Sequence, residues 1–260
     1  MKPNDKIVGR PIRCNQQILK VNGKGYTEVV FLGDVHLGSP QCDKQRLISM
    51  LDYCLANEIY VFLMGDLLEI GTRESVGAGV YEQEFIGQSQ YEQMVLWLKP
   101  LAEKKLLLGT LRGNHEFRCY QMVGVDISKA LARELSIPYL GDACWSTLKV
   151  DKQLYSIYAL HGRSGCRFDG TALLALERIS TSFICDLCVM GHAHKTINSI
   201  VLMQRVHDGQ IKEHKKHLLI TGSFVRYDGG YAQTVGLPIS KLGSPKVKLY
   251  ANKHDLVVSW

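Results

Sequence analysis

The sequence has no apolar stretch long enough to span a membrane. A spanning helix needs roughly 18 to 20 apolar residues, and no uninterrupted run in the 260 residues approaches that length. The opening segment, MKPNDKIVGRPIRCNQQ, is polar and has no apolar run typical of a secretory signal. These absences predict a soluble protein that stays in the cytoplasm and has no membrane partner.

The composition is also not typical of a disordered chain or of a disulfide-rich protein. Hydrophobic residues make up 46% and charged residues 22%, which is ordinary for a globular protein. The 8 cysteines are irregularly spaced, and without a signal segment they are predicted to be reduced and mostly buried. The chain has 31 basic and 25 acidic residues, which gives a net charge of +6. This charge is compatible with a polyanionic partner but does not require one.

The chain has no internal repeat, low-complexity segment or linker, which predicts one domain over residues 1–260. Apolar runs alternate with helical spacing in the first half, and strands dominate the second half. Strands are expected at 26–33, 59–64, 106–112, 144–150, 154–160, 184–190, 198–207, 217–221 and 246–260. Helices are expected at 43–57, 81–105 (disturbed near Pro100), 124–135 and 170–180. The pattern indicates an α/β fold with mixed sheets covered by helices.

Polar motifs follow five of the apolar runs, where strands are expected to end. They are Gly33-Asp34-Val35-His36, Gly65-Asp66, Gly113-Asn114-His115-Glu116, His161-Gly162 and Gly191-His192-Ala193-His194. Because the carboxyl ends of strands converge on one rim in open α/β sheets, we expect these side chains to meet. In Asp-x-His and His-x-His, residues two apart would point to one side of an extended segment.

The rim would then offer seven oxygen and nitrogen ligands to metal ions. They are Asp34, His36, Asp66, Asn114, His161, His192 and His194. Seven ligands are too many for one tetrahedral ion, and they suit two ions about 3.5 to 4 Å apart. Imidazole and carboxylate together favour zinc, iron, manganese or nickel over calcium. Each motif alone has a plainer explanation, such as a turn or a helix cap; the prediction depends on all five occurring in order.

As a set, these motifs resemble those of the calcineurin-like metallophosphoesterase superfamily over residues 33–194. The resemblance implies a four-layer α-β-β-α sandwich with mixed central sheets. It also implies two divalent ions per chain, manganese first, with zinc, iron, nickel or magnesium as alternatives. The segments GTRESVGAGVYEQ and HGRSGCRFDGTALLALE resemble phage- and prophage-encoded members.

The resemblance also implies a role for each motif residue. The first ion would be held by Asp34, His36 and His194, and the second by Asn114, His161 and His192. Asp66 would bridge the two ions. His115 would be the catalytic general acid, and Glu116 would orient it.

The expected reaction is hydrolysis of a phosphate ester. A hydroxide between two cations exists near neutral pH and would attack phosphorus in line, while His115 protonates the leaving alkoxide. Phosphodiesters in nucleic acid or nucleotides are the first-choice substrate. Phosphomonoesters on small molecules or phosphoproteins are the alternative, and a catalytically inactive metal- or nucleic-acid-binding module is the alternative of another class.

The motifs give mixed signals on substrate. GDVHLG resembles the DNA-exonuclease branch, whereas Arg112-Gly113-Asn114-His115-Glu116 resembles the RGNHE of protein Ser/Thr phosphatases. The second motif reads GDLLEIG rather than GD-x-VDRG, so the arginine of those phosphatases is missing, which counts against phosphoprotein. The sequence does not determine the oligomeric state.

Polar and basic residues near the motifs are candidates for contacts with substrate. Asn114, Arg163 and Arg167 would contact the phosphate, and Arg118 and Arg226 are further arginines near motif ends. For each arginine taken singly, surface solubility is the alternative explanation. The segment Arg205–His217, which includes Lys212, Lys215 and Lys216, is either a nucleic-acid-binding edge or a solvated hairpin turning at Asp208-Gly209. Thr72–Gly79 has no P-loop spacing and is expected to be a loop at the rim.

Overall fold

The first of two sheets is built around short, fully buried parallel strands. A computed structural model describes residues 12–72, 75, 80–162, 168–234, 236 and 238–260. Its first sheet has the order β12-β11-β2-β3-β4-β5. The bounds are β2 Tyr26–Leu32, β3 Tyr60–Leu63, β4 Leu107–Leu111, β5 Tyr139–Gly141, β11 Lys246–Tyr250 and β12 Leu256–Ser259. Strands β2 to β5 are parallel, and β11 and β12 are antiparallel additions. Continuous apolar runs such as YVFL form β3 because both of its faces are covered.

The second sheet has the order β1-β6-β7-β8-β10-β9. The bounds are β1 Arg13–Leu19, β6 Ala143–Val150, β7 Gln153–Leu160, β8 Leu187–Met190, β9 Thr196–His207 and β10 Gln210–Thr221. Strands β7, β8 and β10 are parallel to one another, whereas β6–β7 and β9–β10 are antiparallel hairpins. Both sheets are therefore mixed, as expected.

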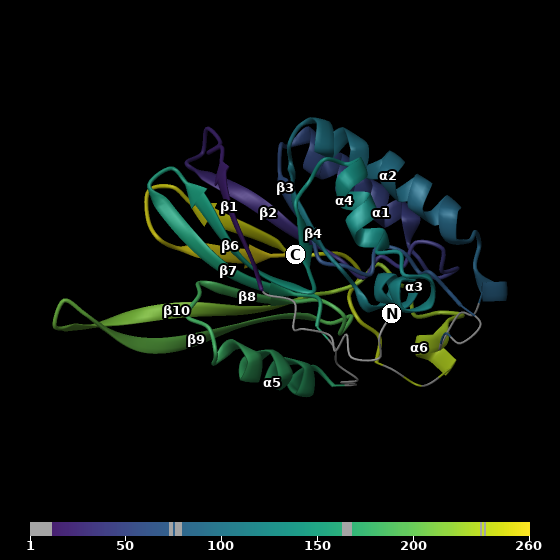
Figure 1. The fold of residues 1–260 in the computed structure, drawn as a ribbon. Coiled ribbons are helices and arrows are strands. Elements are labelled where there is room, and N and C mark those ends of the chain that lie inside the picture. Colours follow the sequence, from purple (N-terminus) through teal and green to yellow (C-terminus); the bar gives the residue numbers. More distant parts are fainter. Residues whose placement is uncertain (1–11, 73–74, 76–79, 163–167, 235, 237) are drawn as a thin grey trace, which may run out of the picture.

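Helices cover the outer face of each sheet (Figure 1). Helices α1 (Lys44–Ala56), α2 (Gly87–Glu103) and α4 (Ile127–Glu134) pack on the first sheet, and α5 (Asp169–Ser180) packs on the second. The remaining helices are the short η1 (Val80–Glu82), α3 (Asn114–Val123) and α6 (Tyr231–Thr234). The order helix, sheet, sheet, helix confirms the expected four-layer α-β-β-α sandwich.

The helices follow from local sequence signals. In α1, Leu47, Leu51 and Cys54 recur on one face and are buried against the sheet. Asp43 caps the helix by accepting a hydrogen bond from the backbone N–H of Arg46 at 3.0 Å. Helix α2 differs from expectation, because it begins at Gly87 and runs through Pro100 without a break. Pro100 has no N–H to donate to the carbonyl of Leu96, so the helix continues with one backbone hydrogen bond fewer.

Among the described residues, four elements were not expected from the sequence: β1, α3, β5 and α6. Strand β1 has the polar sequence RCNQQIL and buries only Leu19 fully, but it pairs in parallel with β6 along its whole length. Helix α3 starts within the third motif, with Gly113 as its N-cap and Asn114 as its first residue. Asn114 is therefore inside the helix and is not its cap.

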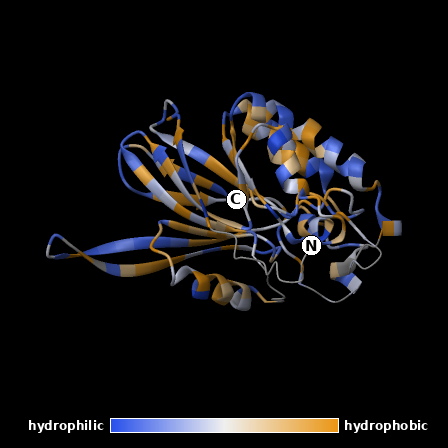
Figure 2. Ribbon diagram, viewed as in Figure 1, coloured by the Kyte–Doolittle hydropathy of each residue, from blue (hydrophilic) through white to orange (hydrophobic). Residues whose placement is uncertain are grey.

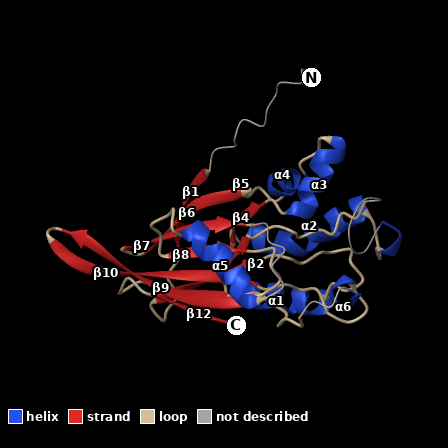
Figure 3. Ribbon diagram, turned by 90° about the horizontal axis from the view of Figure 1, so that it is seen from below, coloured by secondary structure: helices blue, strands red, loops and turns tan. Residues whose placement is uncertain are grey.

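The β9–β10 hairpin projects from the body of the molecule, at the end opposite α2 and α3 (Figures 1 and 3). Its register is unbroken over twelve residue pairs and it turns at Asp208-Gly209, as expected. The outer part of β10 is hydrophilic (Figure 2) and exposes Lys212 and Lys215. Lys216 is different: its side chain is buried, and its ammonium group donates to the backbone carbonyls of Ser180 and Phe183.

Among the described residues, none of the helices is both long and apolar enough to cross a membrane.

Candidate metal centre

All seven predicted ligands lie where strands of the two sheets end. The chain leaves β2 at Asp34, β3 at Asp66 and β4 at Asn114 in the first sheet. In the second sheet, His161 follows β7, and His192 and His194 follow β8. Contacts between these strand ends join the sheets: His161 Nδ1 lies 2.8 Å from the carbonyl oxygen of Met64, and the amide of His192 donates to Asp34 Oδ2 at 2.9 Å.

The backbone at these residues is left-handed rather than extended. The φ values are 50° at Asp34, 53° at His36, 49° at Asp66, 64° at His192 and 51° at His194. The motifs are therefore not extended segments as expected. Asp34 and His36 nevertheless point into one cluster, whereas His192 and His194 belong to different ones. Non-glycine residues in the left-handed region cost roughly 1 to 3 kcal/mol each, and such strain typically gathers at functional sites.

The first cluster consists of Asp34, His36 and His194. Their nitrogen and oxygen atoms lie within 4.8 Å of one another, close enough to hold an ion. His36 Nε2 lies 3.1 Å from His194 Nε2, and His194 Nε2 lies 3.4 Å from Asp34 Oδ1. Asp34 is fully buried, so its carboxylate is held in place by the packed strands.

The second cluster consists of Asp66, His161 and His192, which also lie within 4.8 Å of one another. His161 Nε2 lies 3.2 Å from Asp66 Oδ2 and 3.0 Å from Asn114 Oδ1. The two histidines of the His-x-His motif thus belong to different clusters. This division arises because the chain turns through left-handed residues at 192 and 194.

Asp66 stands between the clusters and belongs to a third group with His36 and His115. Its Oδ1 accepts the backbone N–H of His115 at 2.8 Å. Its Oδ2 is buried and lies 3.2 Å from His161 Nε2, 3.8 Å from His36 Nε2 and 3.9 Å from His115 Nε2. A buried carboxylate oxygen that faces three imidazole nitrogens fits a divalent cation well.

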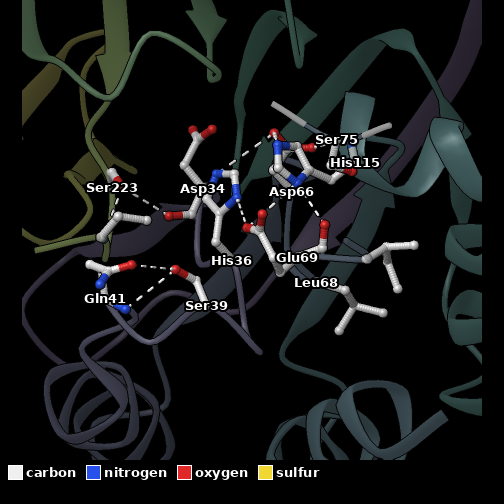
Figure 4. A network of polar contacts seen from close by, with 12 residues as sticks. Asp34, His36, Ser39, Gln41, Asp66, Leu68, Glu69, Ser75, His115 and Ser223 are labelled. Atoms are coloured by element: carbon white, nitrogen blue, oxygen red, sulfur yellow. Dashed lines mark hydrogen bonds and ion pairs between the residues drawn. The ribbon is translucent and has the colours of Figure 1, made fainter. Parts of the chain in front are cut away.

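Glu69 is a site residue that the sequence analysis missed. It is 5% exposed, and its Oε2 accepts a hydrogen bond from His36 Nδ1 at 2.9 Å (Figure 4). The same oxygen lies 3.5 Å from His115 Nδ1, and the backbone carbonyl of Glu69 lies 2.7 Å from that nitrogen. Glu69 therefore fixes the ring orientation of both histidines. An acidic residue inside the apolar segment LLEI, three residues after Asp66, was the signal that could have revealed it.

Glu116 has a different role from the expected one. Its carboxylate accepts the backbone N–H groups of Asp66, Leu67, Leu68 and Gly113 at 2.7 to 3.1 Å. It therefore holds the turn that carries Asp66, and does not orient the ring of His115. Gly113 is required beside it, because a Cβ there would lie 2.1 Å from the amide nitrogen of Asp66.

Arg112, the arginine of the RGNHE sequence, is turned away from the clusters. Its side chain is only 3% exposed and pairs with Asp142 and, at 3.4 Å, with Asp126. Its guanidinium also lies 4.3 Å from the ring centre of Phe117. Two carboxylates already neutralise Arg112, so this arginine is not free to bind a phosphate. The similarity to protein phosphatases at this position is therefore limited to the sequence.

The other predicted substrate contacts have mixed outcomes. Arg163, Arg167 and most of the Thr72–Gly79 loop lie outside the described residues. Arg118 lies beside His115, whereas Arg226 donates to the backbone carbonyl of Pro40 at 3.1 Å.

The carboxylates shift the protonation of the surrounding histidines. Burial lowers the pKa of His36, but the hydrogen bond to Glu69 and the charge of Asp66 outweigh it and raise the pKa to about 9. His161 is likewise lowered by burial, but Asp66 raises its pKa to about 10. Burial raises the pKa of Asp66, but the charges of His161 and His115 outweigh it and hold the pKa well below its ordinary value. The buried carboxylates therefore stabilise positive charge on the groups around them, and protonated imidazoles carry this charge when no metal is bound.

This charge balance predicts that metal binding releases protons. At pH 7 both His36 and His161 are protonated in the metal-free protein because their pKa values lie above 7. Their Nδ1 atoms keep a proton for Glu69 and Met64, so the proton on Nε2 must leave when that atom binds a cation. We expect about two protons released per chain at pH 7, and an apparent metal affinity that rises with pH until about pH 9 to 10.

Calorimetric titration with manganese in two buffers of different ionisation enthalpy measures this release. His36→Gln should release about one proton fewer. His254→Gln is the matched control, since His254 pairs with Asp186 away from the clusters and its loss should change nothing. Binding of two ions without proton release would contradict the charge balance described here.

Comparison with known proteins agrees with this geometry. The sequence profile of the calcineurin-like phosphoesterase family matches residues 27–196, well over half of the chain. That span contains all five motifs and every residue of the three clusters. No curated protein sequence matches the chain.

Solved structures with similar folds are distant in sequence. A predicted phosphoesterase from Streptococcus pneumoniae is 12% identical, with a TM-score of 0.39 over 90% of this chain and 98% of that one. A metallophosphoesterase from Sphaerobacter thermophilus is 14% identical, with a TM-score of 0.39 over 87% and 84%. Vacuolar protein sorting 29 from Cryptosporidium parvum is 16% identical, with a TM-score of 0.39 over 90% and 97%. Similarities this distant carry no argument about substrate.

The family match and the buried cluster of carboxylates and imidazoles lead to one conclusion. The chain belongs to the calcineurin-like phosphoesterase family and is a metal-dependent hydrolase of phosphate esters.

Proposed function

We propose that the protein is a phosphodiesterase whose substrate is nucleic acid or a nucleotide. The observation that carries this proposal is that, among the described residues, the two positions where protein phosphatases carry arginines supply no free guanidinium to the clusters. Ile70 follows Glu69 where protein phosphatases have an arginine, and Arg112 is neutralised by Asp126 and Asp142. A phosphomonoester carries up to two negative charges and a diester only one, so a site with few guanidinium groups favours the diester.

The seven residues would hold two divalent cations, with manganese as the first candidate. Asp34, His36 and His194 would bind one ion, and His161, His192 and Asn114 the other, with Asp66 shared. When bound, such ions supply Lewis-acid stabilisation of phosphoryl oxygens and lower the pKa of water. The chain's own contribution is to fix the ligands in a buried and strained frame before substrate arrives.

His115 would supply the proton for the leaving group. The backbone carbonyl of Glu69 can only accept a hydrogen bond, so His115 Nδ1 carries a proton at 2.7 Å from it. Nε2 is then the nitrogen that faces Asp66, at 3.9 Å from Oδ2. Burial lowers the pKa of His115 to about 4, so the ring is neutral at pH 7 and Nε2 carries no proton before substrate binds. Nε2 would therefore take up a proton from solvent once the anionic phosphate lies beside it, and would pass that proton to the alkoxide as the bond between phosphorus and oxygen breaks. Glu69 would keep the ring in this orientation throughout.

The projecting hairpin supports nucleic acid as the substrate. Lys212 and Lys215 are exposed on β10, on an arm that extends well beyond the body of the molecule (Figure 1). Basic side chains on such an arm can contact backbone phosphates remote from the one that reacts. Lys216 is excluded from this role because it is 1% exposed and bonded to the end of α5.

A double charge reversal, Lys212→Glu with Lys215→Glu, tests this arm. We expect KM for DNA or RNA to rise by about tenfold or more, while KM for bis-nitrophenyl phosphate stays the same. The salt dependence of polynucleotide binding should weaken by about 0.7 to 0.9 in slope for each phosphate that the variant no longer neutralises. Lys99→Glu, an exposed lysine on α2, is the control. An unchanged salt slope in the double variant would remove the hairpin from the binding surface.

An activity panel with manganese tests the proposed function as a whole. It compares a nitrophenyl monoester, a bis-nitrophenyl diester, single- and double-stranded DNA, RNA and cyclic nucleotides. We expect the diester to be hydrolysed faster than the monoester, and at least one nucleic acid or nucleotide to be cleaved. If the monoester reacts faster and all polynucleotides are refused, the protein is a phosphomonoesterase.

A further inference from the structure

We infer that Arg118 binds the scissile phosphate and covers His115 until substrate arrives. Arg118 lies on α3, four residues after Asn114 and three after His115, so all three side chains share one face of the helix. This inference depends on the phosphoesterase chemistry of the family. It names a specificity-determining residue for the proposed diester substrate, but does not require that substrate to be nucleic acid.

The contacts of Arg118 keep its guanidinium at the edge of the clusters. Its Nη2 lies 3.2 Å from His115 Nε2 and its Nη1 lies 3.3 Å from His115 Nδ1, so the guanidinium lies against both nitrogens of the ring. Nη1 also lies 3.4 Å from the hydroxyl oxygen of Ser75. Within the part of the chain that the structure describes, no carboxylate forms an ion pair with it. Arg112 differs in this respect, because Asp142 and Asp126 neutralise its charge. Arg118 therefore keeps an unneutralised positive charge next to the reacting groups.

The hydrogen-bond pattern of His115 explains why this position suits a phosphate ligand. Nδ1 donates to the carbonyl of Glu69 at 2.7 Å, so the ring offers Nε2 to the guanidinium as a neutral acceptor. A phosphate group is anionic and can accept two parallel hydrogen bonds from a guanidinium, whereas the imidazole nitrogen is a single neutral acceptor. A phosphate bound beside Asp66 would therefore attract the guanidinium away from His115.

This exchange would also free the atom that must act on the leaving group. While Arg118 lies against His115 Nε2, that nitrogen cannot approach a departing oxygen. Transfer of the guanidinium to a non-bridging phosphate oxygen would open His115 Nε2, which could then take up a proton from solvent and donate it to the leaving group. The single positive charge of Arg118 matches the single negative charge of a phosphodiester.

The direct test is binding of inorganic phosphate to the manganese-loaded protein, measured by calorimetry. We expect Arg118→Gln to weaken phosphate binding by about 10- to 100-fold and Arg118→Lys to weaken it less, because lysine keeps the charge but loses the fork. Manganese affinity and the unfolding midpoint should stay the same in both variants. Arg133→Gln, an exposed arginine on α4, is the matched control and should bind phosphate normally.

Steady-state kinetics add a readout that a purely structural role would not give. Arg118→Ala should raise KM for bis-nitrophenyl phosphate, and added guanidinium ion should restore part of the loss. Normal phosphate affinity in both Arg118→Gln and Arg118→Lys would overturn the inference. If phosphate binding falls as expected but the panel shows no diester hydrolysis, the assignment of Arg118 stands and the proposed function fails.

Discussion

Replacing Asp66 by asparagine is expected to lower kcat/KM by about 10³-fold or more and to reduce the bound metal below two ions per chain. Asp66 is the residue that faces both clusters, with Oδ2 at 3.2 Å from His161 Nε2 and 3.8 Å from His36 Nε2. A divalent ion contributes several kcal/mol to transition-state stabilisation, and each 1.36 kcal/mol is a factor of ten in rate. One substitution that weakens both ions therefore has the largest effect of any ligand change.

The asparagine amide cannot serve both sides of this residue. Oδ1 of Asp66 accepts the backbone N–H of His115 at 2.8 Å. If the amide oxygen of asparagine keeps that bond, its NH₂ group points at the cluster and repels a cation. If the amide turns over, two N–H donors face each other at His115.

Metal content by mass spectrometry and turnover of bis-nitrophenyl phosphate measure the effect of Asp66→Asn. Asp52→Asn, an exposed carboxylate on α1, is the control and should keep both ions and full activity. Full activity of the unaltered protein in excess chelator after dialysis would contradict the metal-dependent reaction. Two tightly bound ions in Asp66→Asn would contradict the bridging role.

His115→Ala is expected to slow turnover by about 10² to 10⁴-fold while both ions remain bound. His115 is 9% exposed and is held by the Glu69 carbonyl, so its ring is oriented before substrate binds. The loss should be smaller for nitrophenyl esters than for alkyl esters, because nitrophenolate departs without needing a proton. Measuring the turnover of esters whose leaving groups differ in pKa shows how the rate loss depends on the pKa of the leaving group.

Metal content decides between two roles for this histidine, because His115 also belongs to a group with His36 and Asp66 that could hold an ion. A general acid can be removed without loss of metal, whereas a ligand cannot. Loss of one ion in His115→Ala would make it a ligand, and an equal rate loss across all leaving groups would make it a substrate-positioning residue. His254→Ala, remote from the clusters, is the control for loss of an imidazole.

The α/β class and the gathering of the motifs could be predicted from the residues, and the order of the four layers followed from the resemblance of the motifs to a known family. Continuous apolar runs such as VVFLG and YVFLMG require strands with both faces covered, and residues after parallel strands must meet at one edge. Strand β1 could not be found in this way, because RCNQQIL has neither a buried run nor alternation. It is a strand because the edge of β6 offers it a row of backbone partners.

The candidate site shows the same division at the level of single residues. The residue types and their order in the chain named Asp34, His36, Asp66, Asn114, His161, His192 and His194. Their conformation could not be read from the sequence, because the left-handed backbone at Asp34 and His192 accompanies a hydrogen bond between the two sheets. A local pattern rule assumes an extended chain and therefore gave the wrong geometry.

The sequence by itself determined the fold class, the chemistry of the rim and the absence of an arginine after Glu69. Tertiary structure decided what each charged side chain is free to do. Arg112, Lys216 and Arg118 each carry one positive charge. Asp142 neutralises Arg112, however, and Lys216 is buried at the end of α5. Charge is a property of the residue, whereas its availability depends on which carboxylates and carbonyls the packed chain brings within hydrogen-bond distance.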